Sequence, residues 1–98
     1  SFNANPDSMK AGLNGLKAWN SNDGKEPFRV ALLGAMLELG ADETALHTSI
    51  GTYADELGID AIIAVGSAQD QHLDALAQAL ADGARQSQSA SVDRTRQA

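Results

Sequence analysis

Two short apolar runs, each ending at a glycine and followed by a helical pattern, constrain the fold of this chain most strongly. The runs are residues 29–33 before Gly34 and residues 61–65 before Gly66. Short, continuously apolar runs are typical of buried parallel strands, so we expect the first to be central and covered on both faces. The order strand, helix, strand, helix predicts an α/β fold with a Rossmann-like, open, mainly parallel sheet and flanking helices.

Three stretches of the sequence place apolar side chains at helical spacing. The first covers about residues 7–19, where Asp7 or Ser8 can accept hydrogen bonds from the first amides. The second follows a potential cap, Asp42, and stops at Gly58. The third follows the second strand. Their apolar positions are Met9, Leu13 and Leu16; then Leu46, Ile50, Tyr53, Ala54 and Leu57; then Leu73, Leu76, Ala77 and Leu80.

The end of the chain differs in composition from the rest. Residues 84–92 are rich in Ser, Gln and Ala without clear periodicity, which is compatible with a loop, a weak edge strand or a disordered linker. Residues 93–98 could begin another helix. We therefore predict one α/β domain at 1–83, and at 84–98 a polar linker or the start of a further strand and helix unit.

Charge and composition exclude several classes of function. The chain has 13 acidic and 7 basic residues, a formal charge of −6, so nucleic acid is not an expected partner, because binding phosphates needs a basic patch. It has no cysteine, which excludes disulfides and thiolate metal sites and is compatible with the cytoplasm. No apolar run approaches the roughly 20 residues of a membrane helix, so no membrane partner is expected.

The residues that follow the two strands are the first candidates for a site, because ligands of open parallel sheets bind beyond the carboxyl ends of the strands. These are residues 34–40 and 66–69. For Gly34 and Gly66 alone, a tight turn into the next helix is the favoured interpretation. The sequence has neither a G-x-G-x-x-G fingerprint nor a G-K-[ST] phosphate loop, so we do not expect this chain alone to cradle a nucleoside triphosphate in the usual manner.

The side chains offer no catalytic constellation. His47 and His72 are distant in sequence, each falls on an expected helix, and we expect both to face solvent. Asp42 and Glu43 are explained as acidic residues that complement a helix dipole. We therefore predict no catalytic residue and no metal site on this chain.

The polar turn near the start is more specific. Asn3 and Asn5 flank Ala4 just before Pro6, and asparagine presents both a donor and an acceptor. Two such side chains on a loop held by a proline can recognise a base edge or an amide. They can equally stabilise their own turn, and the chemistry alone favours neither interpretation.

Two motifs together resemble a known family. Residues 2–9, Phe-Asn-Ala-Asn-Pro-Asp-Ser-Met, are similar to the Tyr-Asn-Ala-Asn-Pro-Asp-Ser-Met stretch that opens the C-terminal domain of Mur ligases. Residues 34–40, Gly-Ala-Met-Leu-Glu-Leu-Gly, resemble their Gly-Asp-Met-x-Glu-Leu-Gly loop, and Leu46-His47 with Ile50-Gly51 matches the helix after it. The resemblance covers about residues 1–83 and is greatest to the members that add D-alanyl-D-alanine.

The resemblance implies an ATP- and magnesium-dependent amide ligase of cytoplasmic peptidoglycan synthesis. In these enzymes a peptide carboxylate of UDP-N-acetylmuramoyl-tripeptide becomes an acyl phosphate, and the amine of D-alanyl-D-alanine attacks it. Carried over by position, Asn3 and Asn5 would lie on the nucleotide side. Gly34, Met36 and Glu38 would lie on a loop that lines the substrate cleft.

The sequence also departs from the family pattern. Ala35 stands where the family has Asp, Phe2 replaces Tyr, and a later Lys-Gly-Ser segment does not occur. The resemblance thus implies an incomplete C-terminal domain that binds ATP and Mg²⁺ only within a full-length parent and is inactive by itself. Two alternatives stay open: a non-catalytic acidic α/β interaction module, and a related Mur ligase that adds another amino acid.

Overall fold

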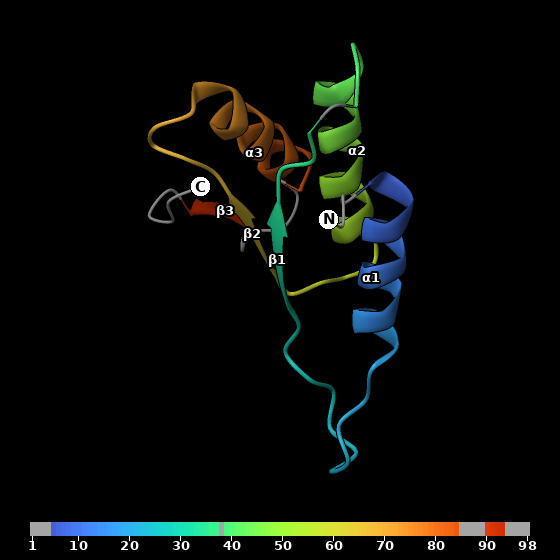
Figure 1. Ribbon diagram of the computed structural model, residues 1–98. Helices are drawn as coiled ribbons and strands as arrows, with labels where there is room; N and C mark the ends of the chain where they lie inside the picture. The colour runs from blue at the N-terminus through green and yellow to red at the C-terminus, as the bar shows by residue number, and fades with distance from the viewer. Residues whose placement is uncertain (1–4, 38, 85–89, 94–98) are drawn as a thin grey trace.

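The computed structural model describes residues 5–37, 39–84 and 90–93. Helices and strands alternate along these residues (Figure 1). In chain order they are α1 (Pro6–Ala18), β1 (Val30–Gly34), α2 (Glu43–Glu56), β2 (Ala61–Val65), α3 (Gln71–Gly83) and β3 (Ala90–Asp93). The predicted helices and strands are confirmed to within one or two residues, and Gly58, at φ +80°, ends the second helix as expected.

The described strands form one parallel sheet in the order β1-β2-β3. Ala31 pairs with Ile62 and Leu33 with Ala64, so these four side chains share one face of the sheet. The strands run in one direction and the helices return in the other (Figure 1). The α/β class with a parallel sheet and flanking helices is therefore confirmed.

The position of β1 in the sheet differs from the sequence prediction. Among the described strands β2 is central and β1 lies at an edge. Val30 and Leu32, on the face opposite Ala31, are 48% and 58% exposed, so β1 is not covered on both faces. The reason is that α2 and α3 both pack on the Ala31 side, and the described residues supply no layer on the other.

The hydrophobic core lies between this covered face of the sheet and the helices. Side chains from β1 and β2 meet those of α2 and α3 in one cluster, and Leu13 joins it from α1. Its buried members are Leu13, Ala31, Met36, Ile50, Ala54, Ile59, Ile62, Ala64, Ala77, Leu80, Ala81 and Ala84. Six of these twelve residues are alanines, so the helices can approach the sheet closely.

Two glycines allow α2 and α3 to cross in direct backbone contact. A Cβ atom at Gly51 would lie 1.9 Å from the carbonyl oxygen of Leu80, and one at Gly83 would lie 2.0 Å from that of Thr48. The Thr52 hydroxyl donates to the carbonyl of Gly83 at 3.1 Å across the same crossing. No larger residue fits at either glycine without separating the helices.

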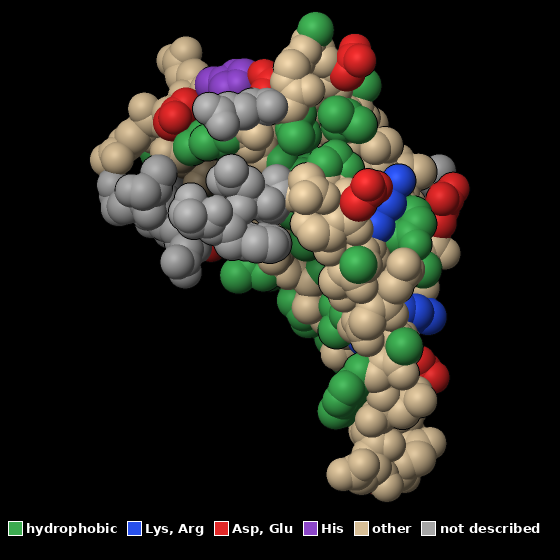
Figure 2. Space-filling view, turned by 45° about the vertical axis from the view of Figure 1, so that its right-hand side comes forward, with side chains coloured by type: hydrophobic (Ala, Val, Ile, Leu, Met, Phe, Trp, Pro, Cys, Tyr) green, Lys and Arg blue, Asp and Glu red, His purple; other side chains and the backbone are tan. Residues whose placement is uncertain are grey.

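A buried arginine ties the far end of the sheet to α1. The guanidinium of Arg29 donates to the carbonyls of Leu16 (3.0 Å) and Trp19 (2.7 Å) and pairs with the carboxylate of Glu26. The backbone N–H of Arg29 donates to the carboxylate of Asp60. The loop between α1 and Arg29 extends away from the helices as a narrow arm (Figure 2).

The third strand settles part of what the sequence left open for residues 84–92. Ala90–Asp93 pairs with β2 in parallel, so these residues form an edge strand, the second of the three alternatives. Residues 94–98, where a helix was expected to begin, lie outside the described residues. The predicted boundary between a domain at 1–83 and a separate segment at 84–98 stays a prediction. Within the described residues no helix is long and apolar enough to span a bilayer.

Candidate functional site

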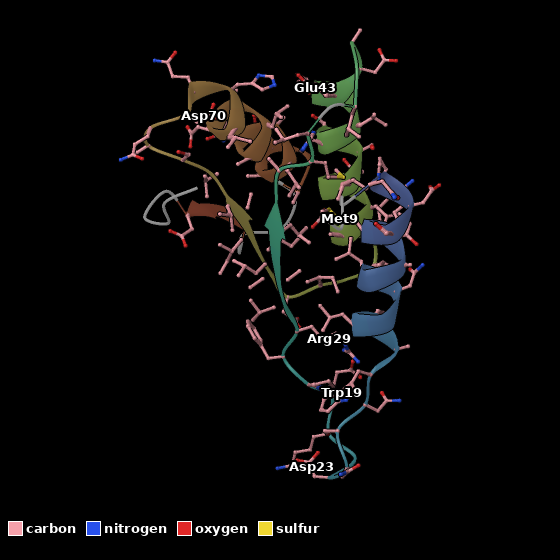
Figure 3. All side chains as sticks on the ribbon, viewed as in Figure 1. Met9, Trp19, Asp23, Arg29, Glu43 and Asp70 are labelled. Atoms are coloured by element: carbon pink, nitrogen blue, oxygen red, sulfur yellow. The ribbon has the colours of Figure 1, made fainter. Side chains whose placement is uncertain are left out.

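The carboxyl ends of the strands and the first turns of the helices face the same end of the molecule. The labelled residues Glu43 and Asp70, at the starts of α2 and α3, lie at this end, whereas Asp23 and Trp19 lie at the opposite one (Figure 3). Residues 34–37, 39–40 and 66–70 join these strands and helices. We call this end of the molecule the carboxyl edge.

Asn5 caps α1, the helix that follows the Asn-Ala-Asn-Pro turn. Its side-chain Oδ1 accepts from the backbone N–H of Ser8 at 2.8 Å, and its own N–H donates to the Ser8 hydroxyl at 3.2 Å. This reciprocal capping box places the helix start at Pro6, and the cap is Asn5 rather than the expected Asp7 or Ser8. The turn-stabilising role of Asn5 is thus seen directly, and its nucleotide role stays a prediction. Asn3 lies outside the described residues.

Residues 34–40, which we call the cleft loop, leave β1 and turn back into α2. Gly34 is exposed, Ala35 is half-buried and Leu37 is 54% exposed. Met36 between them is only 1% exposed, and its side chain belongs to the hydrophobic core. Any contact of Met36 with a ligand would therefore involve its backbone. Glu38 lies outside the described residues, and the role of the loop stays a prediction.

His47 does not face solvent as expected, because it is fully buried under the cleft loop. Its Nε2 accepts from the backbone N–H of Met36 at 2.9 Å. Its Nδ1 lies 2.6 Å from the carbonyl oxygen of Glu43, one turn earlier on α2. His47 thus connects the cleft loop to α2. His72, in contrast, is exposed on α3 as predicted.

The sequence contained a signal for the burial of His47. Ile50 and Ala54, which were assigned to the apolar stripe of α2, follow His47 by three and seven residues. Positions i, i+3 and i+7 share one face of a helix, so His47 lies on the buried stripe. Its bond to Met36 could not be predicted, because it depends on how the loop folds back onto the helix.

A second loop at the carboxyl edge is ordered by side-chain caps. The Ser67 hydroxyl, buried after β2, accepts from the backbone N–H groups of Gln69 and Asp70. The Asp70 carboxylate then caps α3 by accepting from the N–H groups of His72 and Leu73. These bonds give residues 67–70 a defined conformation at the carboxyl edge.

A close contact between two polar side chains on the surface joins the two helices at this edge. Nε2 of His72 on α3 lies 2.8 Å from the carboxylate of Glu43 on α2 (purple beside red in Figure 2). Glu43 therefore contacts both histidines, His47 through its backbone carbonyl and His72 through its side chain. The first turns of α2 and α3 are held together here.

Among the described residues, the carboxyl groups with clearly shifted pKa values lie at the other end of the molecule. The pKa of Asp23 is lowered by hydrogen bonds from the Ser21 hydroxyl and the Lys25 N–H. The pKa of Glu26 is lowered by its hydrogen bond and charge interaction with Arg29. Both carboxylates are fully exposed, and they stabilise the arm rather than indicate an acid or base at the carboxyl edge.

The described residues do not form a site for Mg²⁺. Among residues 5–37, 39–84 and 90–93, no three acidic or histidine side chains gather closely enough to coordinate a metal ion. Glu43 at the carboxyl edge is engaged by His72. The donors for a metal bound near this edge would therefore have to come from elsewhere, and the described residues offer backbone groups and loop shape instead.

Comparison with known proteins identifies the family. A family model described as "Mur ligase, glutamate ligase domain" matches residues 1–98, the whole chain. This chain belongs to the Mur ligase family. The cleft loop, Asn5 and the buried His47 are therefore features of a Mur ligase domain.

Curated members of the Mur ligase family share the sequence at moderate identity. A UDP-N-acetylmuramoyl-tripeptide--D-alanyl-D-alanine ligase of Mycobacterium tuberculosis is 45% identical over 67 residues, 67% of this chain. Proteins of the same name from Mycobacterium leprae and Escherichia coli are 40% identical over 74 residues and 38% identical over 66 residues, or 66% and 67% of this chain. The matched regions make up only 13%, 14% and 13% of these three relatives.

Proposed function

We propose that this chain is part of a ligase that adds D-alanyl-D-alanine to UDP-N-acetylmuramoyl-tripeptide in cytoplasmic peptidoglycan synthesis. The observation that carries the proposal is the cleft loop at the carboxyl edge, whose sequence resembles a motif of the family. Relatives of the chain in Mycobacterium tuberculosis and Escherichia coli bear this activity in their names. The edge position is where ligands of open parallel sheets bind. The full-length parent joins an amine to a carboxylate with consumption of ATP.

The described residues support a binding role rather than a catalytic one. At the carboxyl edge Gly34 and Leu37 of the loop are exposed, while the nearby His47 is buried and hydrogen-bonded. Such a loop can close over a substrate and exclude water, and its described residues, 34–37 and 39–40, include no ionisable or nucleophilic side chain. In our proposal Asn3 and Asn5 lie toward ATP, and Gly34, Met36 and Glu38 lie toward the incoming dipeptide.

Magnesium and the phosphates of ATP are assigned to the rest of the parent. The sequence has no phosphate loop, and the described residues have no metal-binding cluster. The chain therefore contributes shape and positioning to a site whose phosphate chemistry is supplied by other domains. This division predicts that the chain has no ligase activity by itself.

The proposal is tested with the full-length protein that carries this chain. We expect phosphate release from ATP to require both UDP-N-acetylmuramoyl-tripeptide and D-alanyl-D-alanine. The competing activity, addition of a single amino acid, is tested in the same assay with D-glutamate, L-lysine or D-alanine in place of the dipeptide. Turnover with one of these and none with the dipeptide would show that the parent is a different Mur ligase.

A further inference from the structure

The imidazole of His47 is held between two backbone groups of fixed polarity. Nδ1 faces the carbonyl oxygen of Glu43 at 2.6 Å, and Nε2 faces the N–H of Met36 at 2.9 Å. A carbonyl oxygen accepts and a backbone N–H donates, so Nδ1 carries the proton and Nε2 presents its lone pair. One neutral tautomer satisfies both contacts, and the other tautomer satisfies neither.

The cleft loop is attached to the domain through the side chain and the backbone of Met36, and Leu39 packs partly against the same core. The Met36 side chain is buried in the core, and its N–H is bound by His47. Gly34 and Leu37 on either side are exposed. Apolar packing of Met36 and Leu39 does not specify how the peptide N–H of Met36 is directed, and the bond to His47 fixes that orientation.

Packing alone does not explain why a histidine occupies position 47 on the buried face of α2. A leucine would fill a similar volume in the apolar stripe of α2, but it would leave the buried N–H of Met36 without an acceptor. An unsatisfied buried N–H costs about 1–3 kcal/mol, and the loop would escape this penalty by moving outward to water. The polar ring therefore determines where the loop lies, in addition to filling the core.

We propose that His47 is a positioning residue, which holds the cleft loop against α2 in the geometry that receives the incoming dipeptide. The inference rests on the proposed function, because the loop meets a dipeptide only if the parent uses one. His47 touches neither substrate nor reacting atoms and acts through the backbone of Met36. The Glu43 side chain is not required, because His47 uses its carbonyl.

Two amide variants of the full-length protein separate positioning from simple packing. In His47→Gln the side-chain amide reaches as far as the imidazole Nε2 and can accept from Met36. In His47→Asn the amide ends near the position of Nδ1, so it can contact Glu43 but cannot reach Met36. Ile50→Val, a buried change three residues along the same helix face, is the packing control.

The measurements are amide hydrogen exchange of the peptide containing Met36, and kcat and KM for D-alanyl-D-alanine. For His47→Asn we expect exchange and KM to rise about five- to tenfold, the effect of one lost hydrogen bond, with a smaller change in kcat. His47→Gln should stay within about threefold of the wild type, and Ile50→Val should leave both values unchanged. Equal effects of the Asn and Gln variants would overturn the proposal.

Imidazole nitrogen resonances of the wild-type protein give a test that needs no variant. We expect His47 to show a protonated Nδ1 and an unprotonated Nε2, and the opposite tautomer would contradict the proposal even if His47→Asn did not fold. If the wild type shows no dipeptide-dependent turnover, the proposed function fails. Hydrogen exchange and the tautomer would still decide whether His47 holds the loop.

Discussion

At the scale of single residues, three polar side chains have more specific roles than their sequence context indicated. Arg29 stands at the start of an apolar run, yet its guanidinium binds the last carbonyls of α1. His47 supports a loop from beneath, and Asn5 caps a helix. Local spacing identified Asn5 as a turn residue. The α1 carbonyls bound by Arg29 and the Met36 N–H bound by His47 are 10 to 13 positions away, so these contacts depend on tertiary packing.

The two interpretations of Asn5 can be separated by substitution in the full-length protein. Asn5→Ala removes the cap and should lower the free energy of unfolding by about 0.5–2 kcal/mol. Asn5→Ser keeps a capping oxygen and should lower it by only about a few tenths of a kcal/mol. If Asn5 also contacts the nucleotide, both variants should raise the KM for ATP. An unchanged KM for the stable Ser variant would show that Asn5 is a helix cap and nothing more.

The Glu26–Arg29 pair predicts a dependence of stability on pH. Because the pKa of Glu26 is lowered in the folded state, its contribution to stability is present above the unfolded value of about 4.5. That contribution is lost as the pH falls through the lower, folded value. The Tm of the wild type should therefore exceed that of Glu26→Gln at pH 7, and the two should converge once the pH lies below the folded pKa of Glu26. A difference that persists at low pH would mean that Gln disturbs the arm in another way.

At the scale of elements, hydrophobic periodicity and glycine stops located the helices and strands well. The apolar run at 61–65 became β2 with the same bounds, and the stripe of α2 ends where Gly58 takes its positive φ. The exposed outer face of β1 could not be predicted. An apolar run shows that a strand can be buried, but not whether its neighbours supply a layer on each face.

The helix crossing gives a test at this scale. Gly51→Ala should lower the free energy of unfolding by about 2 kcal/mol or more, because the new methyl group would overlap the backbone of α3 and force the helices apart. Gly15→Ala is the matched control, since no neighbour lies within 4 Å of its Cβ position and alanine favours a helix. We expect this control to gain about 0.5–1 kcal/mol. Urea unfolding measures both, and a stable Gly51→Ala variant would show that the crossing is looser than described.

At the scale of the whole molecule, the described residues form a small α/β unit with one covered sheet face and a carboxyl edge where the starts of α2 and α3 meet. Its fold class and the position of that edge followed from the order of strands and helices. The family followed from two motifs, because loop residues that carry function are more specific than a core that any α/β domain can share. The phosphate chemistry could not be located, since neither the sequence nor the described residues carry it.

In the proposed function, this chain shapes a ligase site that other domains complete. The most direct measurement is phosphate release from ATP in the presence of UDP-N-acetylmuramoyl-tripeptide, with and without D-alanyl-D-alanine. It compares the 98-residue chain with the full-length protein that carries it. The account predicts turnover by the full-length protein and none by the chain alone. Turnover by the chain alone, or its absence from the full-length protein, would contradict the account.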